Sequence, residues 1–321
     1  MIYFPFTEIS VNLFSLFITG LLVGIAGGVF GTLSNLLIVP TLTVLGIPLP
    51  ISASASAGLC FGRTSYSVLY ETCKQTAFKR AGLVAGLAGL PFAYAGVRLN
   101  LFLSDTFWGS TVIHISYVVL LIAAAAAIFR QWFFFNRNSY YDDAPFPAFG
   151  LKWKFPLAIP GGSGLSRITP ARVLLIGFIL GTTTGLLGLG SGIIGIPLFM
   201  YILGLPERNS SATDTITMFI LGSCTFLFYA AAGKVEFIVV AVLLLSITLG
   251  NHVGTLIPGE LNLGHARLIL SPLLSATAIA LAISINTGTY PPRLILSIAG
   301  ASSCLALVIM TLFPEKTIPP G

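Results

Sequence analysis

A single arginine inside a long apolar stretch is the first candidate for binding chemistry. Arg63 stands in LCFGRTSYSVLY, twelve residues into an apolar segment at 51–72 (63 − 51 = 12). A charge there is costly and usually faces a wet cavity or a partner. A guanidinium grips an oxyanion through two parallel hydrogen bonds, so we expect Arg63 to contact an anion, with Tyr66 on the same helical face. An ion pair with Asp214, or a position at the segment's edge, remains an alternative.

Two glycine-rich stretches indicate a second kind of anion site. GLLVGIAGGVFGTLSNLLIVP at 20–40 and GFILGTTTGLLGLGSGIIGIP at 177–197 carry Gly, Ser and Pro at matching positions, 157 residues apart (177 − 20 = 157). A helix N-terminus offers unpaired N–H groups and positive potential, and glycine lets a ligand approach the backbone. The candidates for substrate binding are the small polar residues of GTLSN and GLGSG, namely Gly31, Ser34, Asn35, Gly190, Ser191 and Gly192. Close packing of helices through small residues is the alternative.

Three further polar residues lie within apolar segments. Asp214, in SATDTIT, falls in the first turns of its segment and is expected either to cap that helix or to couple transport to a proton or cation. Asn251 and His252, in TLGNHVGT, are candidates for substrate binding. Histidine titrates near neutral pH, so His252 is also a candidate for proton coupling, and a role as a satisfied core histidine is its alternative.

Catalytic and metal-binding patterns are missing from the sequence. There are three histidines and four cysteines, with no CxxC, GxSxG or HExxH. The scattered cysteines are expected to pack as small apolar residues. The chain is therefore not expected to be an enzyme or to carry a cofactor or a metal.

Composition points to an all-α polytopic membrane protein. The chain is 55% hydrophobic and 8% charged, whereas soluble proteins carry about a quarter charged residues. The net charge of +6 comes from lysines and arginines gathered in two loops, which is typical of topology determinants and requires no nucleic acid.

The segments fall into two repeats. Apolar segments can be drawn at 11–46, 51–72, 81–100, 111–135, 171–205, 209–232, 236–258, 266–286 and 291–313. A stretch rich in Pro and Gly at 136–170 reads as a cytoplasmic linker loop. Repeat 1 then covers 11–135, repeat 2 covers 171–286, and an extra C-terminal helix and tail follow at 287–321.

The opening segment of each repeat is too long for one straight crossing. The 36 residues of 11–46 would form a helix of about 54 Å, against a hydrocarbon core of about 30 Å. We therefore expect a broken or re-entrant pair of half-helices. Lys79 and Arg80 lie in the first repeat where the second has only Lys234 and Glu236, which favours inverted repeats over parallel ones.

The doubled pattern resembles the TauE/SafE family of sulfite and organosulfonate exporters. Each copy runs from the glycine-rich stretch through Pro40 or Pro197 to LGIP or LGLP and then to small and hydroxyl residues. The resemblance implies a multi-pass transporter in the cell membrane and a sulfur-containing anion as substrate. From the duplicated stretch itself, we predict that the two half-helix pairs meet near mid-membrane and enclose one anion. Alternatives are an anion channel, proton- or sodium-coupled uptake and, least favoured, an intramembrane enzyme. A homodimer is left open.

Overall fold

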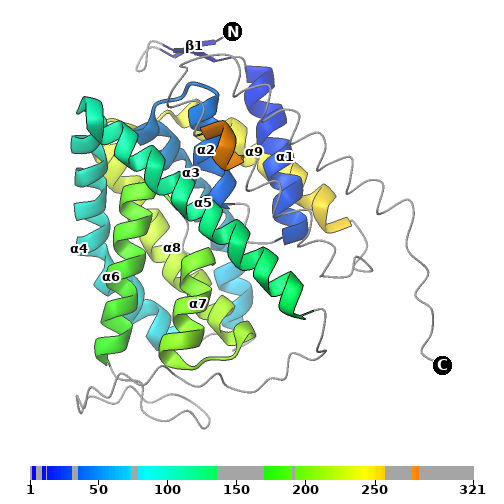
Figure 1. Cartoon of the computed structure of the whole chain (residues 1–321), viewed down its shortest axis with the longest axis vertical. Coiled ribbons are helices and arrows are strands. Elements are labelled where there is room, and N and C mark those ends of the chain that lie inside the picture. The colour runs from blue at the N-terminus through cyan, green and yellow to red at the C-terminus, as the bar shows by residue number, and fades with distance from the viewer. Residues whose placement is uncertain are drawn as a thin grey trace, which may run out of the picture. The chain divides into compact units, whose positions relative to one another are not determined.

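The chain folds into apolar helices in the computed structural model (Figure 1). The structure describes residues 2–4, 9–11, 13–30, 35–73, 79–135, 170–189, 192–256 and 277–281. The strands found in these ranges, β1 (Ile2–Phe4) and β2 (Ile9–Val11), form an antiparallel hairpin that the sequence did not predict. The remaining described elements are helices, which confirms the all-helical part of the expected fold class.

The elements belong to two compact units. Unit 1 holds the hairpin, α1 (Leu13–Phe30), α2 (Asn35–Val44), and most of α5 (Phe107–Phe135) and α9 (Phe237–Leu256). Unit 2 holds α3 (Leu49–Cys73), α4 (Lys79–Ser104), α6 (Pro170–Leu187), α7 (Gly192–Leu203) and α8 (Glu207–Ala231), with the first residues of α5 and α9.

Several of these helices suit a membrane. In the described part of the chain, α4, α8 from Asn209 onward and α9 are long and apolar enough to span one, and shorter apolar helices lie in α1, α2, α5, α6 and α7. Large apolar side chains point outward, such as Leu87 at 52% exposed and Phe102 at 71% exposed on α4. An apolar exterior is what lipid requires, and the prediction of a multi-pass membrane protein is confirmed.

The helices of unit 2 have defined directions. Helices α4 and α6 run parallel, because the numbers of their contacting residues increase together. The contacting pairs are Ala85 with Gly177, Gly89 with Gly181, and Ala93 with Gly185. They also advance together along α4 and α8: Gly82 with Thr213, Gly86 with Ile220, and Tyr94 with Phe228. Along α3 and α8 they advance in opposite senses, so this pair is antiparallel: Gly58 with Phe226, Cys60 with Gly222, and Phe61 with Phe219.

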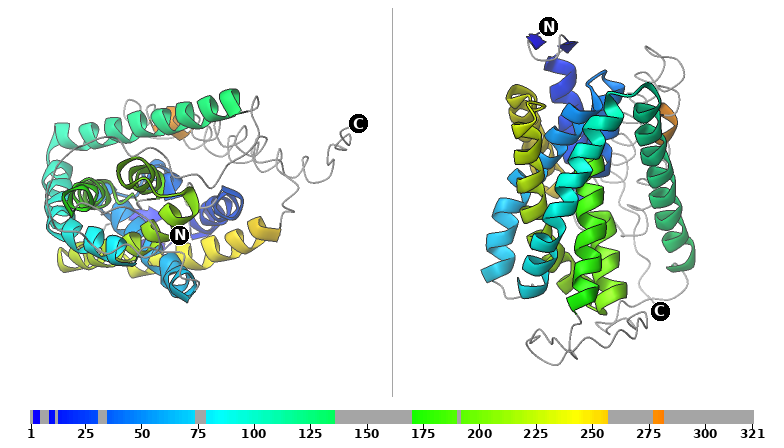
Figure 2. Two further views of the ribbon diagram at one scale, coloured as in Figure 1. Left: turned by 90° about the horizontal axis from the view of Figure 1, so that it is seen from below. Right: turned by 90° about the vertical axis from the view of Figure 1, so that its left-hand side faces the viewer.

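Small residues bring α4 and α6 into backbone contact, and the two helices lie side by side in Figures 1 and 2. A methyl group on Gly181 would overlap the carbonyl oxygen of Gly89, and one on Gly185 would overlap that of Ala93. Glycine at every fourth position of α6 therefore sets the spacing of the pair, as in small-residue packing of transmembrane helices.

The same packing occurs inside unit 1, between α1 and α9. A methyl group on Gly24 would come within 2.5 Å of the Ile247 carbonyl oxygen, and one on Gly28 within 2.5 Å of the Asn251 carbonyl oxygen. Glycines of both repeated stretches thus serve helix packing, whereas the candidate binding residues Gly31 and Gly190 lie outside the described part of the chain.

The LGIP and LGLP motifs end α2 and α7 in the same way. Gly46 and Gly204 have φ of 93° and 71°, the left-handed conformation that glycine adopts after a helix. The N–H of Ile47 donates to the Leu42 carbonyl at 3.1 Å, and that of Leu205 donates to the Phe199 carbonyl at 3.5 Å. The proline that ends each motif, Pro48 or Pro206, stands directly before the next helix.

Element lengths follow the spacing of the sequence repeat. The bounds of α1 and α6, 18 residues each, differ by 157 (170 − 13 and 187 − 30). The bounds of α3 and α8, 25 residues each, differ by 158 (207 − 49 and 231 − 73). In the second opening segment α6 ends at Leu187 and the next two residues are not helical, whereas residues 31–34 of the first lie outside the described part of the chain. The predicted linker and the two last segments lie outside the described residues, apart from Pro170 and residues 277–281, which are helical.

Candidate functional site

The connection between α6 and α7 is buried against α3. Gly188 follows the last residue of α6 with φ of 62°, and a methyl group on it would lie 2.6 Å from both the Cα and the carbonyl oxygen of Ala53. Only glycine combines this backbone conformation with so close an approach. The helix interruption in the second half is therefore held inside the protein, where irregular backbone is tolerated in a membrane.

Side chains from α4 and α8 satisfy the last carbonyls of α6. The Nδ2–H of Asn100 donates to the Leu186 carbonyl at 2.5 Å, and the Tyr229 hydroxyl donates to the Gly185 carbonyl at 2.9 Å. Asn100 and Tyr229 are both fully buried. Neither residue was predicted from the sequence, although a lone Asn near the end of segment 81–100 was a visible signal.

Asp214 lies against the first turn of α7. A methyl group on Gly195 would overlap Oδ1 of Asp214, and this aspartate is 1% exposed. The prediction that Asp214 caps its own helix is wrong, because α8 starts at Glu207 after Pro206, with no side-chain hydrogen bond at that cap. The carboxyl group instead sits beside the start of a neighbouring helix, where the macrodipole favours negative charge.

Arg63 lies near the middle of α3. It follows Phe61 by two residues, and the Phe61 ring packs on the Phe219 ring of α8 at 5.7 Å between centroids. Its side chain is half-buried. The neighbouring Thr64 hydroxyl donates to the Cys60 carbonyl at 2.7 Å. Tyr66 also lies on α3, but its side chain is outside the described part of the structure.

The remaining predicted site residues are spread over several elements. Asn35 begins α2 and is buried, and Gly192 begins α7. On α9, Asn251 is half-buried and His252 is exposed, so His252 is not a core histidine. Gly31, Ser34, Gly190 and Ser191 lie outside the described residues. Of the predicted set, the structure therefore brings together Asp214 and the start of α7.

The turn between α8 and α9 holds a second buried acid. Glu236 is 6% exposed, and its Oε1 has no hydrogen-bond partner among the described residues. Burial raises the pKa of the Glu236 carboxyl above its ordinary value. The same turn is tied to α3, because the Ser54 hydroxyl donates to the Lys234 carbonyl at 2.8 Å. From the sequence, Glu236 was expected only to be a charged loop residue.

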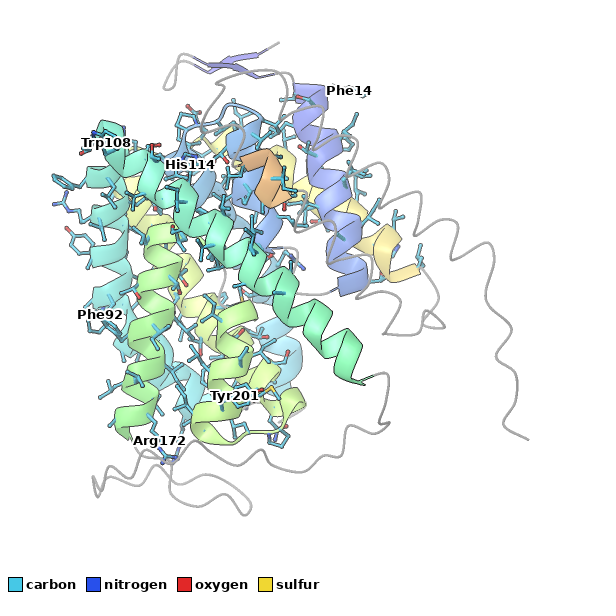
Figure 3. All side chains as sticks on the ribbon, viewed as in Figure 1. Phe14, Phe92, Trp108, His114, Arg172 and Tyr201 are labelled. Atoms are coloured by element: carbon cyan, nitrogen blue, oxygen red, sulfur yellow. The ribbon has the colours of Figure 1, made fainter. Side chains whose placement is uncertain are left out.

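The ends of unit 2 differ in chemistry. Figure 3 labels Trp108, 75% exposed, at one end of these helices and Arg172 at the other. The Arg172 guanidinium donates to the Ile202 carbonyl at 3.4 Å, which joins the start of α6 to the end of α7. Lys79 and Arg80 begin α4, which runs parallel to α6, so these three basic residues share one end.

Comparison with known proteins gives one match. A family model described as "Sulfite exporter TauE/SafE" matches residues 16–281, most of the chain. Neither the curated proteins nor the solved structures contain a match. In the ranges that the structure describes, no group of three His, Cys, Asp or Glu residues is placed to hold a metal ion.

Proposed function

The chain belongs to the sulfite exporter TauE/SafE family, and from this premise we propose that it exports sulfite or a related small sulfur-containing anion across the cell membrane. The match over residues 16–281 carries the proposal, since it includes every described helix from α2 to α9 and most of α1. The family is one of transporters, so the protein is not an enzyme. A dianion leaving a cell that is negative inside by 100 mV gains about 4.6 kcal/mol, and export therefore needs no coupled ion.

Two inverted repeats form the proposed architecture. The offset of 158 makes α8 the counterpart of α3, and the two helices pack antiparallel. Phe61 and Phe219 are counterparts (61 + 158 = 219) and contact each other at the centre of both helices, as expected at a two-fold axis. The matched caps at Gly46 and Gly204 support the same interpretation. Inverted repeats are a common basis for alternating access in transporters.

The proposed topology follows from the basic end of unit 2. Lys79, Arg80 and Arg172 share that end, and basic residues favour the cytoplasm. Because α8 runs parallel to α4, the turn at 232–236 is at the opposite end and is proposed to be outside the cell. The linker at 136–170 precedes α6 and is proposed to be cytoplasmic.

Arg63 is the proposed source of positive charge for the substrate. It is half-buried at the middle of a helix that is packed on both α8 and the α6–α7 connection. A planar guanidinium fits two oxygens of a sulfur oxyanion. The other proposed contacts are the small polar residues of GTLSN and GLGSG together with Asn251 and His252. For transport in the uptake direction, which would need a proton or cation, Asp214 and His252 are the proposed coupling residues.

Flux measurements test the function directly. Full-length protein in liposomes should move sulfite in a saturable way, and unlabelled sulfite should drive counterflow. Arg63→Ala should abolish flux, and Arg63→Lys, which keeps the charge but loses the fork, should retain part of it. Arg98→Ala is the matched control, because Arg98 is exposed on α4 and contacts Tyr94 at 3.1 Å. Absence of sulfur-anion flux in the wild-type protein would contradict the proposal. An ion conductance that corresponds to a flux far above the turnover of a carrier would identify a channel.

A further inference from the structure

Two buried hydroxyl groups near the α6–α7 connection are unused by the fold. Ser56 of α3 is fully buried and Thr184 of α6 is 2% exposed. Neither hydroxyl has a hydrogen-bond partner in the described part of the chain. A buried hydroxyl without a partner costs free energy, so each is expected to meet a ligand or a water molecule.

Both hydroxyls lie one helical turn from the same contact. Ala53 touches Gly188, Ser56 follows Ala53 by three residues, and Thr184 precedes Gly188 by four. Helices α3 and α6 run in opposite directions, because α3 is antiparallel to α8 while α4 is parallel to both α8 and α6. From the Ala53–Gly188 contact, the step toward the C-terminus of α3 and the step toward the N-terminus of α6 therefore point in the same direction. The hydroxyls of Ser56 and Thr184 come to about the same level of unit 2.

The carbonyl groups at the end of α6 are already occupied. The carbonyls of Thr184, Gly185 and Leu186 accept hydrogen bonds from the Gly188 N–H, Tyr229 and Asn100. The negative end of α6 is thereby partly satisfied. The hydroxyl groups of Ser56 and Thr184 remain as donors, each able to give one hydrogen bond.

Positive charge lies on the same side of α3. Arg63 follows Ser56 by seven residues, two turns, so both stand on one face of that helix. Ser56 therefore lies between the helix interruption and the arginine along α3. Donors followed by a cation suit an oxyanion, whereas a cation would be repelled by Arg63.

We propose that Ser56 and Thr184 form an oxyanion subsite in unit 2, in which each hydroxyl donates a hydrogen bond to a sulfite oxygen. The subsite rests on the proposed function and extends it to two residues outside the glycine-rich motifs GTLSN and GLGSG. Its neutral donors hold the anion without adding charge, so the anion can move on toward or away from Arg63.

Sulfite binding by the purified full-length chain tests this subsite. Ser56→Ala and Thr184→Val should each weaken sulfite affinity by about ten- to a hundredfold, the effect of losing a hydrogen bond to a charged group. Their melting temperatures without sulfite should stay at or above the wild-type value. Thr184→Ser, which keeps the donor, should retain affinity. Ser54→Ala is the control, because the Ser54 hydroxyl already donates to the Lys234 carbonyl.

The outcomes separate the subsite from the function. Wild-type affinity in both Ser56→Ala and Thr184→Val would overturn the subsite while leaving sulfite binding by the protein intact. No sulfite binding by the wild-type chain would overturn the proposed function and the subsite together. A third outcome would identify a sodium site instead. In that case the wild-type chain would have a higher melting temperature in sodium chloride than in choline chloride, and both variants would lose this difference while keeping their sulfite affinity. This result would overturn the oxyanion assignment.

Discussion

The counterpart positions Ser56 on α3 and Asp214 on α8 mark the clearest difference between the two halves. They are related by the offset of 158 (56 + 158 = 214), and both are buried, at 0% and 1% exposed. Asp214 places a carboxyl group against the first turn of α7. Ser56 offers a neutral hydroxyl that has no partner among the described residues.

This difference underlies the proposed division of labour. The half that contains Asp214 brings its own negative group to a helix start, where it would compete with any anion from outside. The half that contains Ser56 has a neutral donor in place of that charge, which is the group that we propose binds the anion. On this proposal, one architecture supplies a built-in charge at one position and a binding group at the other.

Packing, by contrast, is alike in both halves. The α1–α9 pair in unit 1 and the α4–α6 pair in unit 2 use glycines at every fourth position, and each brings a glycine Cα against a backbone carbonyl. Substitution at counterpart glycines should therefore have equal effects, whereas substitution at Ser56 and Asp214 should not.

The largest effect is expected from the glycine contacts. Gly181→Leu and its counterpart Gly24→Leu should each destabilise the protein by more than about 3 kcal/mol, because neither backbone contact can admit a side chain. Thermal unfolding followed by size-exclusion chromatography measures this. Ala95→Leu, at an exposed position of α4, is the control and should be neutral. A large loss in only one of the two glycine variants would break the likeness in packing.

Asp214→Ala and Ser56→Ala should differ sharply. Removal of the Asp214 carboxyl takes a favourable charge from the start of α7 and should cost about 1–3 kcal/mol. Removal of the Ser56 hydroxyl takes away a group that the described residues leave unpaired and should change stability by less than about 0.5 kcal/mol. Denaturant unfolding of both variants beside wild type measures the contrast. Equal losses would contradict the division of labour.

A smaller effect is expected at Glu236, where sequence counterparts also differ. Burial raises its pKa in the folded state, so the unfolded chain loses this proton first as pH increases. Its contribution to stability is therefore greatest below the ordinary glutamate pKa and is lost as pH rises through the raised value. Glu236→Gln should remove this decline, which melting temperatures at acidic to neutral pH would reveal. An unchanged pH profile would contradict the assignment.

The fold was predictable from sequence where one residue type has one physical use. A glycine at a helix end with a proline shortly after it predicts a C-terminal cap. Both the LGIP and the LGLP motif form such caps. The end of α6 at Leu187, inside the second long apolar segment, was predicted from segment length. The matching break near Gly31 stays a prediction, because it lies outside the described residues. The N-terminal hairpin was missed, because three-residue strands carry too little pattern.

The candidate site was harder to predict, because hydrogen-bond partners depend on packing. Asn100, Tyr229 and Thr184 are isolated polar residues within apolar segments. Which groups they contact is determined only when α4, α6 and α8 pack together. Asp214 was expected to serve its own helix, but its nearest helix start in space belongs to α7. Sequence spacing could identify the polar residues without pairing them.

The inverted relation of the halves is the central claim, and vesicles of known orientation test it most directly. Single cysteines at Lys79, Thr106 and Lys234, all exposed, would be placed in a chain lacking its four native cysteines and treated with a maleimide that cannot cross the membrane. The account predicts that the cysteine at 79 reacts only from the cytoplasmic side and those at 106 and 234 only from the outside. Reaction at 79 and 234 from the same side would contradict it.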